Sequence, residues 1–233
     1  SVITFNAAIS ACEKGAQWLG ALGVFLDMRS RCLKADVISC SAVISACEKC
    51  ALWQKALGTL SDMWISRSRV DVIATNAAIS ACDKGAQWQQ ALSTLKEMRF
   101  RLFVPTHFTY SAAISACAKG AQSKKALAML SSMRSQELEC DVVCHNAAIT
   151  ACEKAGQWLA AIGLVSEMRH YRVELGVVTF TAAISACEKG SAWQQAASVL
   201  ADMRRFRTQP QLMAFNAAIS ACEKGAQWHK ALG

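Results

Sequence analysis

The sequence predicts an all-α fold, an α-solenoid of stacked helical hairpins, and three observations lead to this prediction. A 35-residue repeat runs through the whole chain without a change of register. Each repeat contains two segments whose apolar residues recur at the spacing of an α-helix. The chain of 233 residues is 53% hydrophobic and 18% charged, with only two prolines, so it can form a core of uninterrupted helices. Repeats of this length bury their apolar surface against neighbouring repeats.

A single repeat array accounts for residues 1–233. Its register is set by the polar residue before each apolar run, at Asn6, Ser41, Asn76, Ser111, Asn146, Thr181 and Asn216. The complete repeats are residues 2–36, 37–71, 72–106, 107–141, 142–176 and 177–211, followed by a partial repeat at 212–233. Ser1 corresponds to the last residue of an earlier repeat, and Gly233 falls within an expected second helix. We therefore expect the sequence to be a fragment of a longer protein.

The first helix of each repeat is expected to bury one apolar face. In the first repeat the spacing i, i+3, i+4 and i+7 is occupied by Phe5, Ala8, Ile9 and Cys12. The residues expected to cap the start of this helix are Thr4, Ser39, Thr109 and Thr179. Lys14 stands near its end, where a positive charge interacts favourably with the helix dipole.

The second helix follows a short turn. Its apolar spacing in the first repeat is given by Trp18, Ala21, Leu22, Phe25 and Met28. Gly15 lies between the two helices, where a helix C-terminus favours a residue that tolerates positive φ. A small residue recurs at Ala21, Ala56, Ala91, Ala126, Ala161, Ala196 and Ala231, which indicates a close helix crossing. The recurrent methionine of this helix is interpreted as core rather than as part of a cofactor site.

The twelve cysteines are interpreted as thiols of a reduced protein. One position per repeat on the buried face is occupied by Cys12, Cys47, Cys82, Cys117, Cys152, Cys187 and Cys222. The Cys47 and Cys50 pair has the spacing of half a zinc site, but a second pair at suitable spacing is missing. The Cys140, Cys144 and His145 run has one residue too many for a haem-attachment signature. We expect no metal site and no cofactor.

Catalytic and membrane signatures are absent from the sequence. The four histidines, His107, His145, His170 and His229, occupy unrelated places in the repeat, and no deaminase motif accompanies them. There is no glycine-rich phosphate loop and no apolar run long enough to span a membrane. We therefore expect no enzyme activity, no small-molecule substrate and no membrane partner.

A second stripe of the first helix is expected to face solvent. It consists in the first repeat of Ile3, Asn6, Ser10 and Lys14, in the order apolar, polar, polar, basic. Its apolar members in the seven repeats are Ile3, Ile38, Ile73, Phe108, Val143, Val178 and Met213, and its lysines are Lys14, Lys49, Lys84, Lys119, Lys154, Lys189 and Lys224. A single-stranded nucleic acid offers matching groups: a flat apolar base face, a hydrogen-bonding base edge and a phosphate. The alternative is that the polar residues suit the first helical turn and the lysine solvates its end.

The run V-I-T-F-N-A-A-I-S-A-C-E-K-G-A-Q-W, followed by the Ala-Leu and Asp-Met pairs, resembles the pentatricopeptide repeat family across the entire chain. Pro105 and Pro210, one residue before a repeat ends, add to the resemblance. The tetratricopeptide repeat, with a 34-residue period, fits less well. The resemblance implies a right-handed superhelical α-solenoid of P-type repeats.

The resemblance also implies that each repeat binds one RNA base. The fifth and last residues of a repeat read the base, and the second residue packs on it. The recurrent lysine is expected from the stripe itself to meet a phosphate. The reading pairs are Asn6 with Asp36, Ser41 with Asp71, Asn76 with Thr106, Ser111 with Asp141, Asn146 with Gly176, and Thr181 with Gln211, with Asn216 in the partial repeat. An aspartate can accept the imino hydrogen of uracil or guanine, so Asp36, Asp71 and Asp141 are expected to select one of these two bases. The resemblance implies uracil for asparagine with aspartate and guanine for serine with aspartate, and hence 5′-U-G-pyrimidine-G-3′ for the first four repeats. Gly176 and Gln211 depart from the family pattern, and helix capping is the alternative role for the aspartates.

The predicted function is sequence-selective binding of single-stranded RNA. The resemblance places it in the processing, editing, stabilisation or translation of a transcript in a mitochondrion or plastid. The net charge of +8 is compatible with an RNA partner. Protein partners are left open for flanking regions. The alternatives are a helical-repeat scaffold for protein interaction and a recently duplicated array without a target.

Overall fold

The structure is a computed structural model, and it describes residues 1–31, 33, 35–65, 70–206 and 208–226. All regular secondary structure in these ranges is helical, which confirms the predicted all-α fold. The helices that begin the repeats are α1 (Val2–Lys14), α3 (Val37–Lys49), α5 (Val72–Lys84), α7 (His107–Lys119), α9 (Val142–Lys154), α11 (Val177–Lys189) and α13 (Leu212–Lys224). The helices that complete them are α2 (Trp18–Ser30), α4 (Trp53–Ile65), α6 (Trp88–Phe100), α8 (Ser123–Ser135), α10 (Trp158–His170) and α12 (Trp193–Arg205). The expected second helix of the partial repeat, which includes Ala231 and His229, lies outside the described residues.

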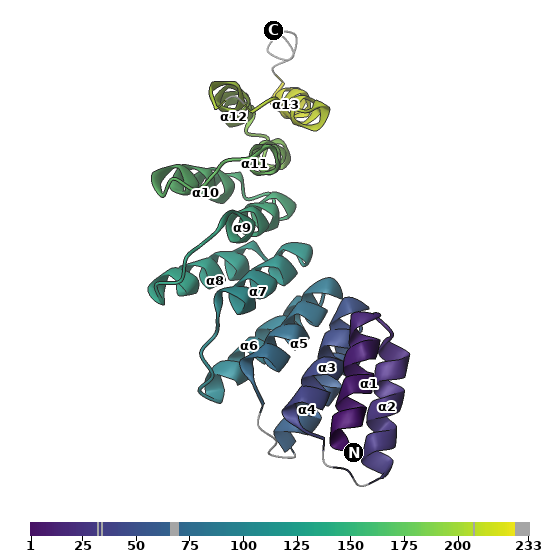
Figure 1. The fold of residues 1–233 in the computed structure, drawn as a ribbon. Coiled ribbons are helices and arrows are strands. Elements are labelled where there is room, and N and C mark those ends of the chain that lie inside the picture. The colour runs from purple at the N-terminus through teal and green to yellow at the C-terminus, as the bar shows by residue number, and fades with distance from the viewer. Residues whose placement is uncertain (32, 34, 66–69, 207, 227–233) are drawn as a thin grey trace. The chain divides into compact units, whose positions relative to one another are not determined.

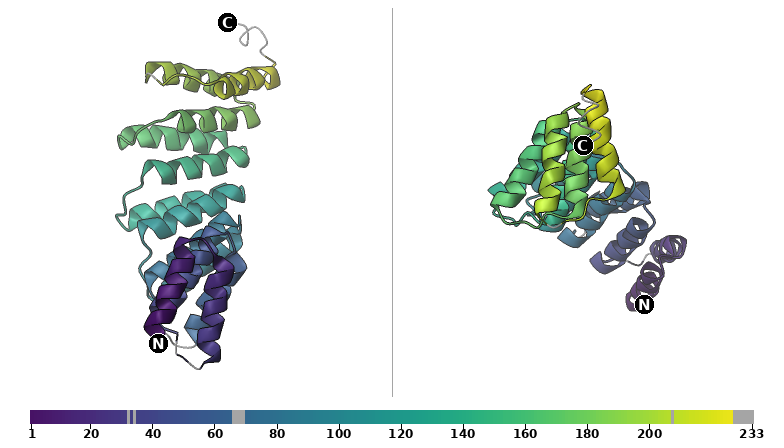
Figure 2. Two further views of the ribbon diagram at one scale, coloured as in Figure 1. Left: turned by 45° about the vertical axis from the view of Figure 1, so that its right-hand side comes forward. Right: turned by 90° about the horizontal axis from the view of Figure 1, so that it is seen from above.

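The chain divides into two compact units, residues 1–116 and residues 117–233. In the first unit α1, α3 and α5 pack in succession, and each also contacts the second helix of its own repeat (Figure 1). In the second unit α9, α11 and α13 pack in the same succession beside α8, α10 and α12 (Figure 2). Both units therefore show the nearest-neighbour packing that is typical of repeat arrays. None of the described helices has the length and apolar character needed to cross a membrane.

The predicted buried face of the first helix forms the core of each unit. In α3, Val43, Ile44 and Cys47 are fully buried, and Ala56 of α4 is buried beside them. The equivalent Ala8 of α1 is exposed, because within this chain no repeat packs in front of it. The alanines and methionines of the second helices are buried as well, which confirms their interpretation as core.

Six of the seven recurrent cysteines are buried among these apolar side chains, and Cys12 is half-buried. Burial raises the pKa of the Cys47 thiol to about 11 and that of Cys82 to about 12. A thiol with such a pKa carries almost no thiolate at neutral pH, so it is a poor nucleophile and a poor metal ligand. These cysteines act as small apolar groups of the core.

The turn between the two helices differs from the prediction in one respect. Gly15, Gly85, Gly190 and Gly225 are the C-caps of their helices, but their φ angles lie between −80° and −90°, a conformation open to any residue. The left-handed residue is the next one, with φ of 51° at Ala16, 55° at Ala86 and 55° at Ser191. The expectation that Gly15 supplies positive φ is therefore wrong. Only α9 follows the expected rule, since Ala155 caps it and Gly156 takes φ of 65°.

Three of the recurrent glycines, Gly85, Gly190 and Gly225, lie against a tryptophan of the preceding repeat. A Cβ atom added to Gly85 would lie 2.5 Å from Cδ1 of Trp53, and one added to Gly190 would lie 2.9 Å from Cγ of Trp158. Gly225 stands in the same relation to Trp193. In the one complete repeat that begins its second helix with serine instead, at Ser123, the following repeat has Ala155 in place of the glycine. At these three positions the glycine leaves room for the indole ring. Cys50, which occupies the same position after Trp18, shows that the ring does not exclude a side chain in every repeat.

The left-handed turn residue offers a test of this description. We expect Ser191→Gly to raise the free energy of unfolding by about 1 kcal/mol, because glycine adopts positive φ without the steric cost that a Cβ atom imposes. Chemical denaturation measures this change. The reverse substitution, Gly156→Ala, should lower the stability by a similar amount, and equal stability of both variants and the parent would contradict the assignment.

Candidate nucleic-acid interface

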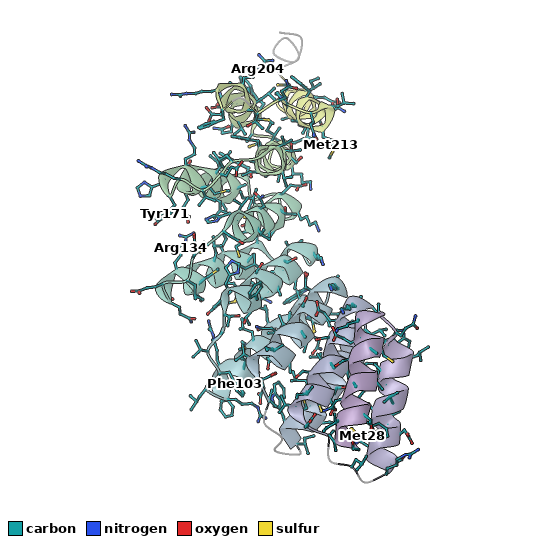
Figure 3. The ribbon with its side chains drawn as sticks, in the orientation of Figure 1. Met28, Phe103, Arg134, Tyr171, Arg204 and Met213 are labelled. Carbon is teal, nitrogen blue, oxygen red and sulfur yellow. The ribbon has the colours of Figure 1, made fainter. Side chains whose placement is uncertain are left out.

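In each of the two units, exposed apolar side chains recur at one position of the first helices of the repeats. These side chains, which we call the apolar row, are Ile3, Ile38, Ile73, Phe108, Val143, Val178 and Met213. Each is the second residue of its helix, and their exposed fractions lie between 61% for Val143 and 79% for Ile3. Figure 3 labels Met213, which belongs to α13. The apolar members of the predicted stripe are therefore exposed, and recurrent exposure of large apolar side chains is typical of a binding surface.

The fifth and last residues of the first repeat lie in direct contact. Asn6 Nδ2 donates a hydrogen bond to Asp36 Oδ2 at 2.8 Å. The hydroxyl of Ser39, at the start of the next repeat, approaches Asn6 Oδ1 at 2.7 Å and Asp36 Oδ1 at 2.6 Å. Burial alone would raise the pKa of Asp36, but the hydrogen bonds from Ser39 and Asn6 outweigh it and lower the pKa. The carboxylate is therefore charged and held in one orientation at neutral pH.

The next two repeats bring the corresponding residues together with different geometry. Ser41 Oγ lies 3.4 Å from Asp71 Oδ1, at the outer limit of a hydrogen bond. Asn76 Nδ2 donates to Thr106 Oγ1 at 3.2 Å, and Thr109 Oγ1 donates to Asn76 Oδ1 at 2.6 Å. The sequence-predicted pairing of the fifth and last residues is thus a contact in each of the first three repeats.

The second unit shows where the remaining predicted residues lie. Asn146 Oδ1 accepts a hydrogen bond from Thr179 Oγ1 at 2.7 Å, whereas Gly176 offers no side chain. Thr181 is half-buried, and its hydroxyl has no hydrogen-bond partner among the described atoms. Gln211 and Asn216 are exposed. Ser111, in the first unit, is half-buried.

The aspartates at the repeat ends also cap the helices that follow them. The side chains of Asp36, Asp71 and Asp141 accept hydrogen bonds from the backbone N–H groups of Ser39, Ala74 and Cys144 at 2.7 to 2.9 Å. The alternative role of these aspartates as helix caps is therefore confirmed. In Asp36 the Oδ1 atom caps the helix, while Oδ2 accepts the hydrogen bond from Asn6. One carboxylate can serve both the helix and a ligand.

The predicted capping residues occupy a different position from the one expected. Thr4, Ser39, Thr109 and Thr179 lie one turn inside the helix, as its third residue, rather than before it. The hydroxyl groups of Ser39 and Thr109 accept a backbone N–H from the cap residue, from Asp36 at 3.3 Å and from Thr106 at 2.9 Å. Ser39, Thr109 and Thr179 also bond the asparagine of the preceding repeat, a contact that single-repeat patterns could not reveal.

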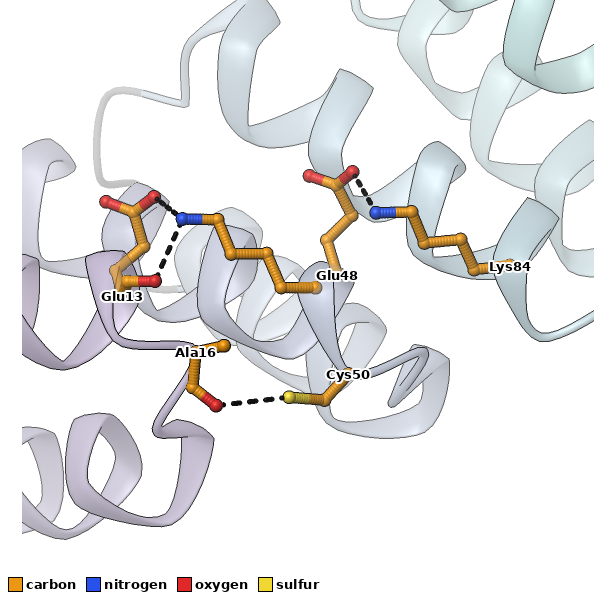
Figure 4. A network of polar contacts seen from close by, with 6 residues as sticks. Glu13, Ala16, Glu48, Cys50 and Lys84 are labelled. Atoms are coloured by element: carbon orange, nitrogen blue, oxygen red, sulfur yellow. Dashed lines mark hydrogen bonds and ion pairs between the residues drawn. The ribbon is translucent and has the colours of Figure 1, made fainter.

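Four lysines of the stripe hold ion pairs with the preceding repeat. The pairs are Lys49 with Glu13, Lys84 with Glu48, Lys189 with Glu153 and Lys224 with Glu188, at 2.8 to 2.9 Å. Figure 4 shows Glu48 facing Lys84, beside the hydrogen bond from Cys50 Sγ to Ala16 O. Hydrogen bonds from Lys224 and Ser220 hold the pKa of Glu188 below its usual value despite burial. The positive charge of these lysines is partly neutralised within the protein.

Lys154 differs from these four lysines. The residue that corresponds to their glutamates is Ala118, so no carboxylate occupies that place. Within the described part of the chain Lys154 has no ion-pair partner, and neither has Lys14. The Thr150 hydroxyl, whose equivalents Ser80 and Ser220 bond the glutamate, donates instead to Asn146 O of its own helix at 2.8 Å.

The segments of this chain that match the same family model begin at positions that differ by a multiple of 35 residues. The pentatricopeptide repeat domain matches residues 128–189 and 163–224, and the PPR repeat matches residues 3–33 and 108–138. No match is found among curated proteins.

Solved structures with a similar fold are pentatricopeptide repeat proteins. PPR10 in complex with an 18-nt psaJ RNA element is 15% identical with a TM-score of 0.57, over 99% of this chain and 39% of PPR10. The PPR domain of Arabidopsis thaliana PRORP1 in complex with tRNA is 14% identical with a TM-score of 0.65, over 80% of this chain and 95% of that domain. PRORP2 from A. thaliana is 11% identical with a TM-score of 0.69, over 77% of this chain and 40% of PRORP2. The chain thus spans well under half the length of PPR10 and of PRORP2, and at these identities the likeness concerns the fold.

Proposed function

Because the chain belongs to the pentatricopeptide repeat family, we propose that it binds single-stranded RNA in a sequence-selective manner, with one base per repeat. The observation that carries this proposal is the apolar row, in which every repeat exposes an apolar side chain three residues before a polar one. Base stacking on such a row is tolerant of sequence, and the polar pair beside it can discriminate between base edges. The RNA complexes of PPR10 and of the PRORP1 PPR domain support the proposal.

The proposed mechanism is binding alone. The second residue of each repeat packs on a base, and the fifth and last residues contact its edge. A carboxylate accepts the imino hydrogen that uracil and guanine carry, so Asp36, Asp71 and Asp141 favour these two bases. The resemblance to the family assigns uracil to asparagine with aspartate and guanine to serine with aspartate, which gives 5′-U-G-pyrimidine-G-3′ for the first four repeats. Gly176 and Gln211 give the fifth and sixth repeats little selectivity. In the cell such binding serves processing, editing, stabilisation or translation of a transcript in a mitochondrion or plastid.

The Asp71→Asn variant tests the proposed readout. We expect its affinity for an oligonucleotide with guanine at the second position to fall about 10-fold, and that for adenine to rise, because a carboxamide can donate to adenine N1 whereas a carboxylate cannot. Fluorescence anisotropy with four oligonucleotides that differ at this base measures the change. Asp62→Asn is the control, because Asp62 lies on α4 and pairs with Arg29 away from the apolar row. An unchanged order of the four affinities in Asp71→Asn would contradict the assignment.

The lysines of the stripe are proposed to contact phosphates, and their ion pairs predict unequal contributions. We expect Lys154→Gln to weaken RNA binding more than Lys84→Gln does, because Glu48 already neutralises Lys84 while Lys154 is unpaired in the described structure. Each phosphate contact adds about 0.7 to the slope of log affinity against log salt for a single strand. Titrations at several salt concentrations should show this loss of slope for Lys154→Gln and a smaller one for Lys84→Gln. Equal losses would contradict the account.

A further inference from the structure

The asparagines at the fifth position are held by hydroxyl groups of the next repeat. Ser39 Oγ lies 2.7 Å from Asn6 Oδ1, Thr109 Oγ1 lies 2.6 Å from Asn76 Oδ1, and Thr179 Oγ1 lies 2.7 Å from Asn146 Oδ1. All three hydroxyl-bearing residues are fully buried. The third contact forms although the repeat of Asn146 ends in Gly176, so it does not depend on the side chain of the last residue.

The sequence pairs these residues without exception. Where the fifth residue is asparagine, the third residue of the next repeat is serine or threonine, as in Asn6 with Ser39, Asn76 with Thr109, and Asn146 with Thr179. Where the fifth residue is serine or threonine, that third residue has no hydroxyl group, as in Ser41 with Ala74, Ser111 with Cys144, and Thr181 with Ala214. The first turn of the helix forms in both cases, so capping alone does not explain the alternation.

The carboxamide of an asparagine can flip by 180°, which exchanges the positions of its NH2 donor and its carbonyl acceptor, unless neighbouring groups fix its orientation. In the first repeat Asp36 can only accept and therefore faces Asn6 Nδ2, which leaves Asn6 Oδ1 toward the Ser39 hydroxyl. The single hydrogen of this hydroxyl is shared between Asn6 Oδ1 at 2.7 Å and Asp36 Oδ1 at 2.6 Å. In the third repeat the contacts close into a ring, from Asn76 Nδ2 to Thr106 Oγ1, from there to Thr109 Oγ1, and back to Asn76 Oδ1. In both repeats one N–H of the amide is used within the protein and the second remains for a ligand.

We propose that the third residue of each repeat is a positioning residue for base readout by the repeat before it. Its hydroxyl group fixes the carboxamide so that the free N–H, and not the carbonyl oxygen, is offered to a base. The matching base edge is one with a carbonyl acceptor, such as that of uracil, and adenine has none. This inference rests on the proposed RNA binding and adds a residue to each reading pair that contains asparagine.

The first experiment removes the hydroxyl group. The Ser39→Ala variant and the parent chain are titrated with four RNA oligonucleotides that differ only at the base assigned to the first repeat. We expect the preference for uracil to fall about 3- to 10-fold, the usual effect of one lost hydrogen bond. Ser39→Thr should retain the preference, because Thr109 and Thr179 fill the same role in other repeats. Alanine stands at this position in Ala74 and Ala214, so the variant is expected to fold, and thermal unfolding monitors this.

The second experiment builds the contact where it does not occur. Ser41→Asn alone gives the second repeat an asparagine that lacks its hydroxyl partner, and Ser41→Asn with Ala74→Ser supplies both. We expect the double variant to prefer uracil over adenine at the second position about 3- to 10-fold more strongly than the single variant.

The outcomes separate the inference from the function on which it rests. RNA binding with equal base preference in the parent and Ser39→Ala, and in the single and double variants, overturns the positioning role but leaves the proposed function intact. A parent chain that is folded and binds none of the oligonucleotides overturns both. A role in stability alone would lower the unfolding temperature of Ser39→Ala without changing the ratio of its affinities, and this result also overturns the inference.

Discussion

Replacing Gly190 by alanine is expected to lower the free energy of unfolding by about 2 kcal/mol, within the usual range for overpacking. The new Cβ atom would lie 2.9 Å from Cγ of Trp158, so the indole ring of the preceding repeat must leave its position. The backbone of Gly190 contributes nothing to the cost, because its φ of −90° suits alanine. Chemical denaturation of the purified chain measures the loss.

A double-mutant cycle with Trp158→Ser isolates the contact. In the Trp158→Ser background, Gly190→Ala should be neutral or slightly stabilising, because alanine restricts the unfolded chain more than glycine does. The chain already contains this combination in Ser123 and Ala155. A loss of equal size with and without the indole ring would show that the glycine is required for another reason.

Polar substitution within the apolar row is expected to weaken RNA binding about 100-fold. The variant combines Ile38→Ser and Ile73→Ser, and each lost base–side chain contact costs about 1–3 kcal/mol. Both side chains are exposed, at 62% and 68%, so the substitutions should change the stability of the chain little. Affinity for a single-stranded RNA and the thermal unfolding midpoint are measured on the same preparations.

The matched control places the same change on another helix. Leu19→Ser with Leu26→Ser removes two leucines of α2 whose exposed fractions, 67% and 59%, are similar to those of the row. This variant should bind RNA as the parent does. If both double variants lose the same amount of RNA affinity, the loss comes from making any exposed apolar surface polar, and the apolar row does not contact RNA specifically.

The helical fold could be predicted because each repeat carries its own signals. The spacing of Phe5, Ile9 and Cys12 predicts a buried helical face, and the invariant period indicates that this face packs on the next repeat. The role of the turn glycine could not be predicted in the same way. Gly190 is needed because Trp158 of another repeat lies over it, and a helix-end rule considers only the residues of one turn.

The sequence predicted the positions of the candidate-site residues, but it predicted only some of the contacts between them. The pairing of Asn6 with Asp36 and the exposure of Ile3 agree with the structure. The hydroxyl contact of Ser39 and the ion pair between Glu13 and Lys49 were missed, because their partners lie 33 and 36 residues apart, across a repeat boundary. The hydroxyl contact of Ser39 has a signal in the sequence. The third residue of a repeat alternates between residues with and without a hydroxyl group, such as Ser39 and Ala74, in step with the fifth residue of the repeat before it.

The most direct test of the central claim is selection of RNA from a randomised single-stranded pool by the folded chain, repeated at low and high salt. The account predicts enrichment of a 5′-U-G-pyrimidine-G-3′ core and an affinity that falls as the salt concentration rises. A chain that is shown to be folded, yet enriches no sequence and binds the pool without dependence on salt, would contradict it.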